Sequence, residues 1–205
     1  MDGIIIALFF LIGCLTGFLS GFLGVGGGFI LVPLLIFIGV PTYVAIGSSL
    51  AYIVFTAISG AIQHYKQKSF DLKLALLILC SGLVTAQIGA VMTLYIEAGY
   101  LEMLLGIILL GAGIRMIIQK SGESINKDIK GRRHHEILTP IAIGLITGFL
   151  SGLLGVGGGF LLVPLLVLVL HVPIKIAIGT SLIGVVGSAA SGAIRHWMIG
   201  HVDLS

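Results

Sequence analysis

The sequence predicts an all-α polytopic membrane protein built from two homologous repeats, and three observations carry this prediction. The mean hydropathy is +1.21, with 58% hydrophobic and 9% charged residues, whereas soluble domains carry roughly 45–50% apolar and about 25% charged residues. Long apolar runs follow one another along the chain, and a 20-residue motif occurs twice. A chain this apolar cannot cover its own surface in water, so its solvent is lipid.

The same composition excludes other classes of protein. Nine of the 19 charged residues lie between Arg115 and Glu136, so the basic excess marks a cytoplasmic loop and not a nucleic-acid-binding face. Cys14 and Cys80 lie in apolar runs without metal-ligand spacing, which is typical of packing residues. The apolar runs contain no Ser-His-Asp, paired-carboxylate or metal-ligand pattern. We therefore expect no enzyme activity, cofactor or metal.

A membrane span needs about 20 mostly apolar residues. The apolar runs lie at about 4–23, 29–40, 44–62, 72–94, 101–118, 137–154, 160–172 and 176–194. The run 29–40 is too short to cross the membrane as a straight helix. It follows the Gly-Val-Gly-Gly-Gly stretch at 24–28 and contains Pro33, and glycine and proline at this density break helices. We therefore expect a broken or re-entrant helix there.

The internal repeat sets the domain organisation. Residues 16–35 read TGFLSGFLGVGGGFILVPLL, and residues 147–166 read TGFLSGLLGVGGGFLLVPLL. The match continues through AIGSSL and AIGTSL at 45–50 and 177–182, and through SGAIQH and SGAIRH at 59–64 and 191–196. This predicts a first transmembrane repeat at 1–118, a basic cytoplasmic linker at 119–136 and an incomplete second repeat at 137–205, without counterparts of about 73–118.

Loop charges favour an inverted arrangement of the two repeats, because three pairs of equivalent loops exchange their basic character. Three basic residues follow the third run of copy one (Lys66, Lys68, Lys73), but only Arg195 lies there in copy two. In copy two the basic residues lie before that run (Lys175) and in the lead-in to the repeat (Lys130, Arg132, Arg133). This predicts an N-terminus outside and a linker in the cytoplasm. The alternative is four spans per unit in parallel, with the glycine run as a re-entrant loop.

The glycines fall into two groups with different expected roles. Those spaced at i, i+4 and i+8 predict close helix packing: Gly13, Gly17 and Gly21 in copy one, and Gly144, Gly148 and Gly152 in copy two. The triplets at 26–28 and 157–159 each precede a short apolar helix, whose freed N-terminal amides form an anion site. The alternative is a structural crossing point without a ligand. A phosphate-cradling nucleotide loop is not expected, because no βαβ pattern surrounds either triplet.

Candidate substrate-binding residues lie at these breaks and among the few polar residues of the spans. They are Gly24, Gly26, Gly27, Gly28, Ser48, Ser49, Gln87, Gly155, Gly157, Gly158, Gly159, Thr180 and Ser181. The alternative role of the hydroxyls is structural, because a buried hydroxyl often bonds to the preceding helical turn. An amide at mid-membrane such as Gln87 is instead a functional candidate. His64, Arg195 and His196 end their runs as interfacial anchors or, alternatively, as a proton-linked gate or anion vestibule.

The doubled motif G-F-L-S-G-x-L-G-V-G-G-G-F-x-L-V-P, with A-I-G-[ST]-S-L and S-G-A-I-x-H after it, resembles the TauE/SafE sulfite exporter family, also called toluene sulfonate uptake permeases. The resemblance implies a multi-pass carrier of the cytoplasmic membrane, built by duplication, which moves sulfite or small organosulfonates, often outward. The family motif carries over to Gly24, Gly26, Gly27, Gly28 and Pro33, and in copy two to Gly155, Gly157, Gly158, Gly159 and Pro164.

Together these features predict a secondary transporter whose paired broken helices bind a small anion near mid-membrane, with one repeat rocking against the other. The expected partners are the lipid bilayer, the anionic substrate and either a second copy or a partner subunit, without nucleic acid. The alternative function is a non-transporting membrane subunit or assembly factor that another chain completes. A membrane-embedded enzyme is disfavoured by the lack of ionisable residues in the spans.

Overall fold

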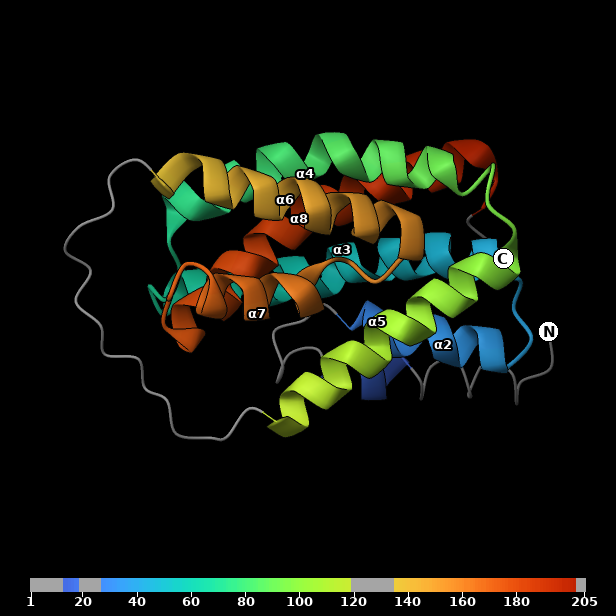
Figure 1. The fold of residues 1–205 in the computed structure, drawn as a ribbon, viewed down its shortest axis with the longest axis horizontal. Helices are drawn as coiled ribbons and strands as arrows, with labels where there is room; N and C mark the ends of the chain where they lie inside the picture. The colour runs from blue at the N-terminus through green and yellow to red at the C-terminus, as the bar shows by residue number, and fades with distance from the viewer. Residues whose placement is uncertain (1–12, 19–26, 119–134, 202–205) are drawn as a thin grey trace.

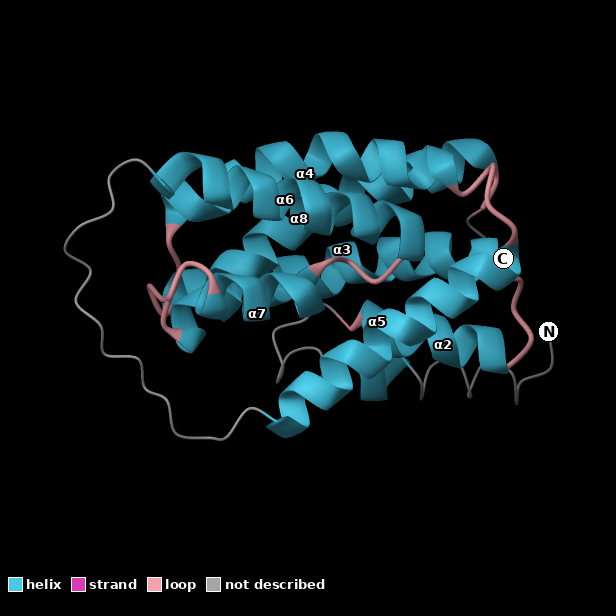
Figure 2. Cartoon of the chain, viewed as in Figure 1, coloured by secondary structure: helices cyan, strands magenta, loops and turns pink. Residues whose placement is uncertain are grey.

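The computed structural model describes residues 13–18, 27–118 and 135–201, and all regular secondary structure in these residues is helical (Figure 2). The helices are α2 (Gly28–Phe37), α3 (Thr42–Lys66), α4 (Leu72–Met92), α5 (Ala98–Ile118), α6 (His135–Leu154), α7 (Gly159–Leu168) and α8 (Ile174–Ile199). A further helical stretch covers residues 13–18. The all-α prediction is confirmed, and the helices follow the apolar runs.

Four helices of the described part are long and apolar enough to cross a membrane: α3, α4, α6 from Ile137 onward, and α8. By contrast, α2 and α7 have ten residues each. At 1.5 Å per residue each is about 15 Å long, half of the roughly 30 Å thickness of the hydrocarbon core. They are therefore half-helices, as the short run 29–40 predicts.

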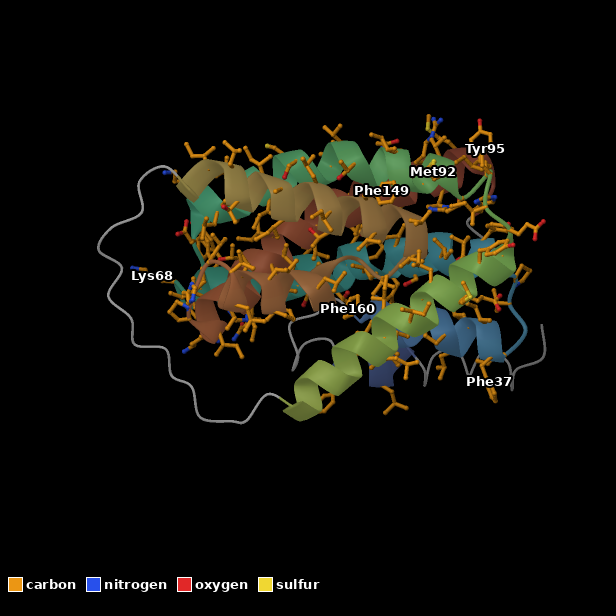
Figure 3. All side chains as sticks on the ribbon, in the orientation of Figure 1. Phe37, Lys68, Met92, Tyr95, Phe149 and Phe160 are labelled. Carbon is orange, nitrogen blue, oxygen red and sulfur yellow. The ribbon has the colours of Figure 1, made fainter. Side chains whose placement is uncertain are left out.

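The outer surface of the bundle is apolar. Large hydrophobic side chains such as Phe37, Phe55 and Leu138 are exposed, and Figure 3 shows Phe37, Met92 and Tyr95 at the periphery. The helix α8 is the most buried of the four spans, because it packs against α3, α4, α6 and α7. An apolar outer surface of this kind suits contact with lipid tails.

Glycines allow α4 and α6 to approach closely, side by side (Figure 1). A Cβ atom on Gly148 would lie 2.4 Å from the Gly82 Cα, and one on Gly152 would lie 2.0 Å from the Ala86 carbonyl oxygen. A Cβ on Gly144 would likewise meet Ser81 and Ile78. The small-residue packing prediction is thus confirmed for all three glycines of copy two.

For copy one the same prediction is tested only in part, because residues 1–12 and 19–26 lie outside the described ones. A Cβ on Gly13 would meet no described atom within 4 Å, and one on Gly17 would lie 3.0 Å from the Tyr52 hydroxyl of α3. The contact with Tyr52 agrees with close packing at Gly17, and for Gly13 the packing role stays a prediction. The third glycine of this set, Gly21, lies outside the described residues.

The helices α3 and α8 form an antiparallel pair with reciprocal contacts. A Cβ on Gly60 would lie 2.9 Å from Leu182, and one on Gly192 would lie 3.0 Å from Leu50. In the sequence repeat Leu50 corresponds to Leu182, and Gly60 corresponds to Gly192. The leucine of each copy therefore packs against the glycine of the other copy, as residues do across a two-fold axis.

The prolines inside the half-helices do not end them, in contrast to what the density of glycine and proline predicts. Pro33 lies within α2 and Pro164 within α7, and each helix continues for four further residues. Each proline removes one backbone hydrogen bond without changing a helical φ. The break lies only at the glycines that precede these helices.

Gly89→Ala tests the contact between α4 and α6. Its Cβ would lie 2.2 Å from the Phe149 carbonyl oxygen, so we expect overpacking to lower the free energy of unfolding by about 1–3 kcal/mol. Gly106→Ala is the control, because its Cβ would meet nothing within 4 Å, and alanine there strengthens the helix by up to about 1 kcal/mol. Thermal unfolding in detergent compares the two variants, and equal midpoints would contradict the close contact.

Candidate functional site

Glycine is required where the two half-helices begin. The N-cap residue of α2 is Gly27, with φ of +77°, and the N-cap residue of α7 is Gly158, with φ of +67°. Gly155 and Gly157 also have positive φ, at +70° and +79°. L-residues with side chains disfavour this region. The glycine run therefore reverses the chain direction at a point that no other sequence would tolerate as easily.

Protein encloses this break completely in copy two. Residues 151–160, which include the end of α6, the glycine run and the start of α7, are all buried. In copy one, Gly27 and Gly28 are buried as well. Non-helical backbone at membrane depth is tolerated only where it is buried in protein or lines a cavity. The structure meets this condition at the break of copy two and, in copy one, at Gly27 and Gly28.

The two half-helices begin next to each other. The rings of Phe29 and Phe160, which are equivalent in the repeat, stack with centroids 6.2 Å apart. A Cβ on Gly28 would lie 2.9 Å from the Gly155 carbonyl oxygen. Both Gly28 and Gly157 contact Ile53, near the middle of α3. From this shared origin at mid-depth α2 and α7 run in opposite directions (Figure 1).

Several backbone amides at this origin have no acceptor among the described residues. Among the described residues none accepts a hydrogen bond from the N–H groups of 27–29 or 157–160, whereas the amides of Leu161 and Leu162 bond to the Gly158 carbonyl at 3.1 and 2.9 Å. The first turn of a helix has no intrahelical acceptor for its amides, and each N-terminus carries about +0.5 of an elementary charge. Two such ends together provide hydrogen-bond donors and positive potential, which is the requirement of an anion site.

The predicted hydroxyl residues take different places. The Ser49 hydroxyl donates to the Gly155 carbonyl at 2.8 Å, so it joins α3 to the break of the other copy. Thr180 accepts from the Asp71 amide at 2.9 Å, near the end of α3, and Ser181 donates to the Ile178 carbonyl. Ser48 is half-buried. The structure brings Ser49 to the break together with Gly27, Gly28, Gly155 and 157–159.

Gln87 connects α4 to α8. Its Nε2 donates to the backbone oxygen and to the Oγ of Ser191, both at 2.9 Å. The Ser191 hydroxyl in turn donates to the Leu83 carbonyl at 2.7 Å. The partners that an amide needs at membrane depth are therefore protein groups. Gly24 and Gly26, also predicted as binding residues, lie outside the described residues.

Two histidine clusters lie at opposite ends of the α3–α8 pair. At the end of α3, His64 Nδ1 lies 2.8 Å from the Ser69 hydroxyl. At the end of α8, His196 is fully buried, and its Nε2 donates to the Gly152 carbonyl at 2.9 Å, because a carbonyl only accepts. In its neutral form His196 then accepts at Nδ1 from His201 Nδ1, at 3.3 Å.

His201 and Tyr43 complete the second cluster, and Arg195 precedes His196 in the sequence. The ring of Tyr43, at the start of α3, stacks on His201 with centroids 5.1 Å apart, and burial lowers the pKa of the His201 imidazole. The Arg195 Nε is buried and has no partner among the described residues. Sequence reasoning missed His201, although it occupies the position equivalent to Ser69 in the repeat.

A narrow crevice beside the start of α7 was also missed. It lies between four helices and is too narrow to admit a water molecule. Its lining residues are Ile78 and Gly82 of α4, Thr147 and Gly148 of α6, Gly157, Gly158 and Leu162 around the break, and Gly184, Val185 and Ser188 of α8. Half of these residues are glycines, so the walls of the crevice are largely backbone.

Spanning helices that enclose half-helices beginning together at mid-depth are typical of multi-pass membrane transporters. The sequence profile of the family described as sulfite exporter TauE/SafE matches residues 9–205, and the chain belongs to this family. It is thus a multi-pass membrane protein of a transporter family, and the family is not one of enzymes.

Several curated relatives support this assignment. The chain is 30% identical to "Probable membrane transporter protein YunE" and to "Probable membrane transporter protein YdhB", both of Bacillus subtilis, over 94% and 96% of its own length and 78% and 80% of theirs. It is also 30% identical to "Probable membrane transporter protein MJ0441" of Methanocaldococcus jannaschii, over 98% of this chain and 75% of that protein. No solved structure matches the chain.

Gln87→Leu tests whether this amide is structural. We expect the free energy of unfolding to fall by about 1–3 kcal/mol, because buried groups of Ser191 lose a partner. Thermal unfolding in detergent measures the change. Combined with Ser191→Ala, the stability losses are expected to be non-additive. Unchanged stability of Gln87→Leu would contradict a structural role for this amide.

Proposed function

We propose that this protein is a secondary transporter that exports sulfite or related small organosulfur anions across the cytoplasmic membrane. The observation that carries the proposal is the origin of α2 and α7, where seven amides of residues 27–29 and 157–160 have no acceptor among the described residues. Membership of the sulfite exporter TauE/SafE family supports the same substrate class. The anion binds to the backbone there and not to a cationic side chain.

The charge of the site favours a singly charged anion. The two helix N-termini together supply about one elementary charge, and the crevice beside α7 is lined by no Lys or Arg. At low dielectric an uncompensated second negative charge is costly. Hydrogensulfite or an organosulfonate therefore fits this field better than a dianion such as sulfate.

Transport occurs by alternating access between two inverted repeats. The antiparallel α3–α8 pair and its reciprocal contacts support this arrangement, because the two copies then have opposite directions across the membrane. The histidine clusters lie at the two ends of this pair and act as gates. His196 bonds the Gly152 carbonyl next to the break, so opening the gate at that end frees the end of α6.

Gly27→Leu and Gly158→Leu test the backbone site. Both residues have positive φ, so a side chain strains the turn and displaces the amides that follow. We expect each variant to insert into the membrane and to lose sulfite flux in proteoliposomes. Gly106→Leu is the control, because its position is open, and it is expected to retain flux. Unchanged flux in both N-cap variants would contradict a backbone anion site.

Cysteine labelling tests the inversion. Lys68 and Gly200 are equivalent in the repeat and follow α3 and α8 respectively. In a chain with Cys14 and Cys80 replaced by serine, we expect a membrane-impermeant maleimide to reach Lys68→Cys only from the cytoplasm. It should reach Gly200→Cys only from outside. Labelling of both from the same side would mean parallel repeats.

A further inference from the structure

Ser151 has a buried hydroxyl that no described residue bonds, and it lies close to the start of α7. The residue lies on α6, is fully buried, and its Oγ forms no hydrogen bond with any described group. Its Cβ lies 3.5 Å from the position of a Cβ on Gly158, the N-cap residue of α7. The Ser151 side chain thus begins beside the N-cap residue of α7. Buried hydroxyls are normally hydrogen-bonded, because a buried hydroxyl without a partner has lost its hydrogen bonds to water and has gained none within the protein.

Copy one has a tyrosine where copy two has one of the glycines of the crevice. Thr16 and Gly17 are the counterparts of Thr147 and Gly148, which line the crevice, and Tyr52 is the counterpart of Gly184. The Tyr52 hydroxyl lies 3.1 Å from the Thr16 hydroxyl and would lie 3.0 Å from a Cβ on Gly17. In copy one the Tyr52 side chain therefore lies beside Thr16 and Gly17. In copy two the crevice lies beside the equivalent residues, Thr147 and Gly148.

We propose that the Ser151 hydroxyl is a direct ligand of the transported anion, and that the anion is bound on the copy-two side of the two-fold axis. This rests on the proposed function, which assigns the anion to the half-helix origin. The hydroxyl donates one hydrogen bond, and the amides of 157–160 donate others. A small oxyanion has the several acceptor oxygens that such a set of donors requires. The crevice is closed to water here, so the anion enters when α7 moves away from α6.

The two copies provide a matched pair of variants. Ser151→Ala and Ser20→Ala alter equivalent residues of the repeated motif, although Ser20 lies outside the described residues. Each variant is reconstituted as the full chain in nanodiscs, and sodium sulfite is titrated by calorimetry with sodium chloride as the control salt. We expect Ser151→Ala to weaken sulfite binding roughly 10- to 100-fold, as for loss of a hydrogen bond to a charged group. Ser20→Ala should change it less than twofold.

Thermal unfolding without sulfite separates a ligand from a structural residue. Because the Ser151 hydroxyl has no partner among the described residues, Ser151→Ala should keep or raise the unfolding midpoint, and only the stabilisation by added sulfite should shrink. A lower midpoint in the absence of sulfite would assign Ser151 a structural role and overturn the proposal.

The remaining outcomes are equally decisive. Equal losses of affinity in Ser20→Ala and Ser151→Ala would overturn the one-sided site. Sulfite binding that survives Ser151→Ala but not Gly158→Leu would overturn the role of Ser151 and leave the proposed backbone site in place. Binding that survives all three substitutions would contradict the proposed function itself.

Discussion

Hydrocarbon offers no hydrogen-bond partner to a polypeptide, and this constraint shapes the centre of the molecule. A helix that stops halfway across a membrane exposes a turn of unbonded amides, so the turn must be enclosed by protein. Here the enclosure consists of spanning helices around residues 151–160, all of which are buried. Three contacts hold this enclosure together. The helix α4 packs tightly against α6, both half-helices begin beside Ile53, and the Ser49 hydroxyl bonds to the Gly155 carbonyl.

Enclosure leaves an electrostatic imbalance at the same place. Two helix N-termini of like sign lie together at mid-depth, and like partial charges repel most strongly where the dielectric constant is low. Packing alone does not relieve this repulsion, whereas an anion between the two ends does. The arrangement is therefore electrostatically complementary to a negatively charged ligand before any side chain is considered, and this is why the proposed anion site consists mainly of glycine.

Sequence patterns predicted the elements well and their partners poorly. Apolar run length determined the spans, and the glycine triplets located the breaks, because both depend on local chemistry. The glycine spacing of residues 144–152 predicted close packing but not that α4 is the partner, since tertiary neighbours decide contact. For the same reason the motif gives no sign that Ser151 has an unpaired hydroxyl. A comparison of the two copies at Tyr52 and Gly184 was the available signal.

The reciprocal contact between α3 and α8 has a consequence for how such a molecule varies. Where two identical chains meet across a two-fold axis, every substitution appears on both sides, and a residue that benefits one side is imposed on the other. Within one duplicated chain the two copies are separate stretches of sequence, so a substitution in one copy leaves the other unchanged. Leu50 and Gly60 keep the shared contact with their counterparts, while Tyr52 and Gly184 differ. Duplication thus preserves the symmetric framework and permits a centre that is not symmetric.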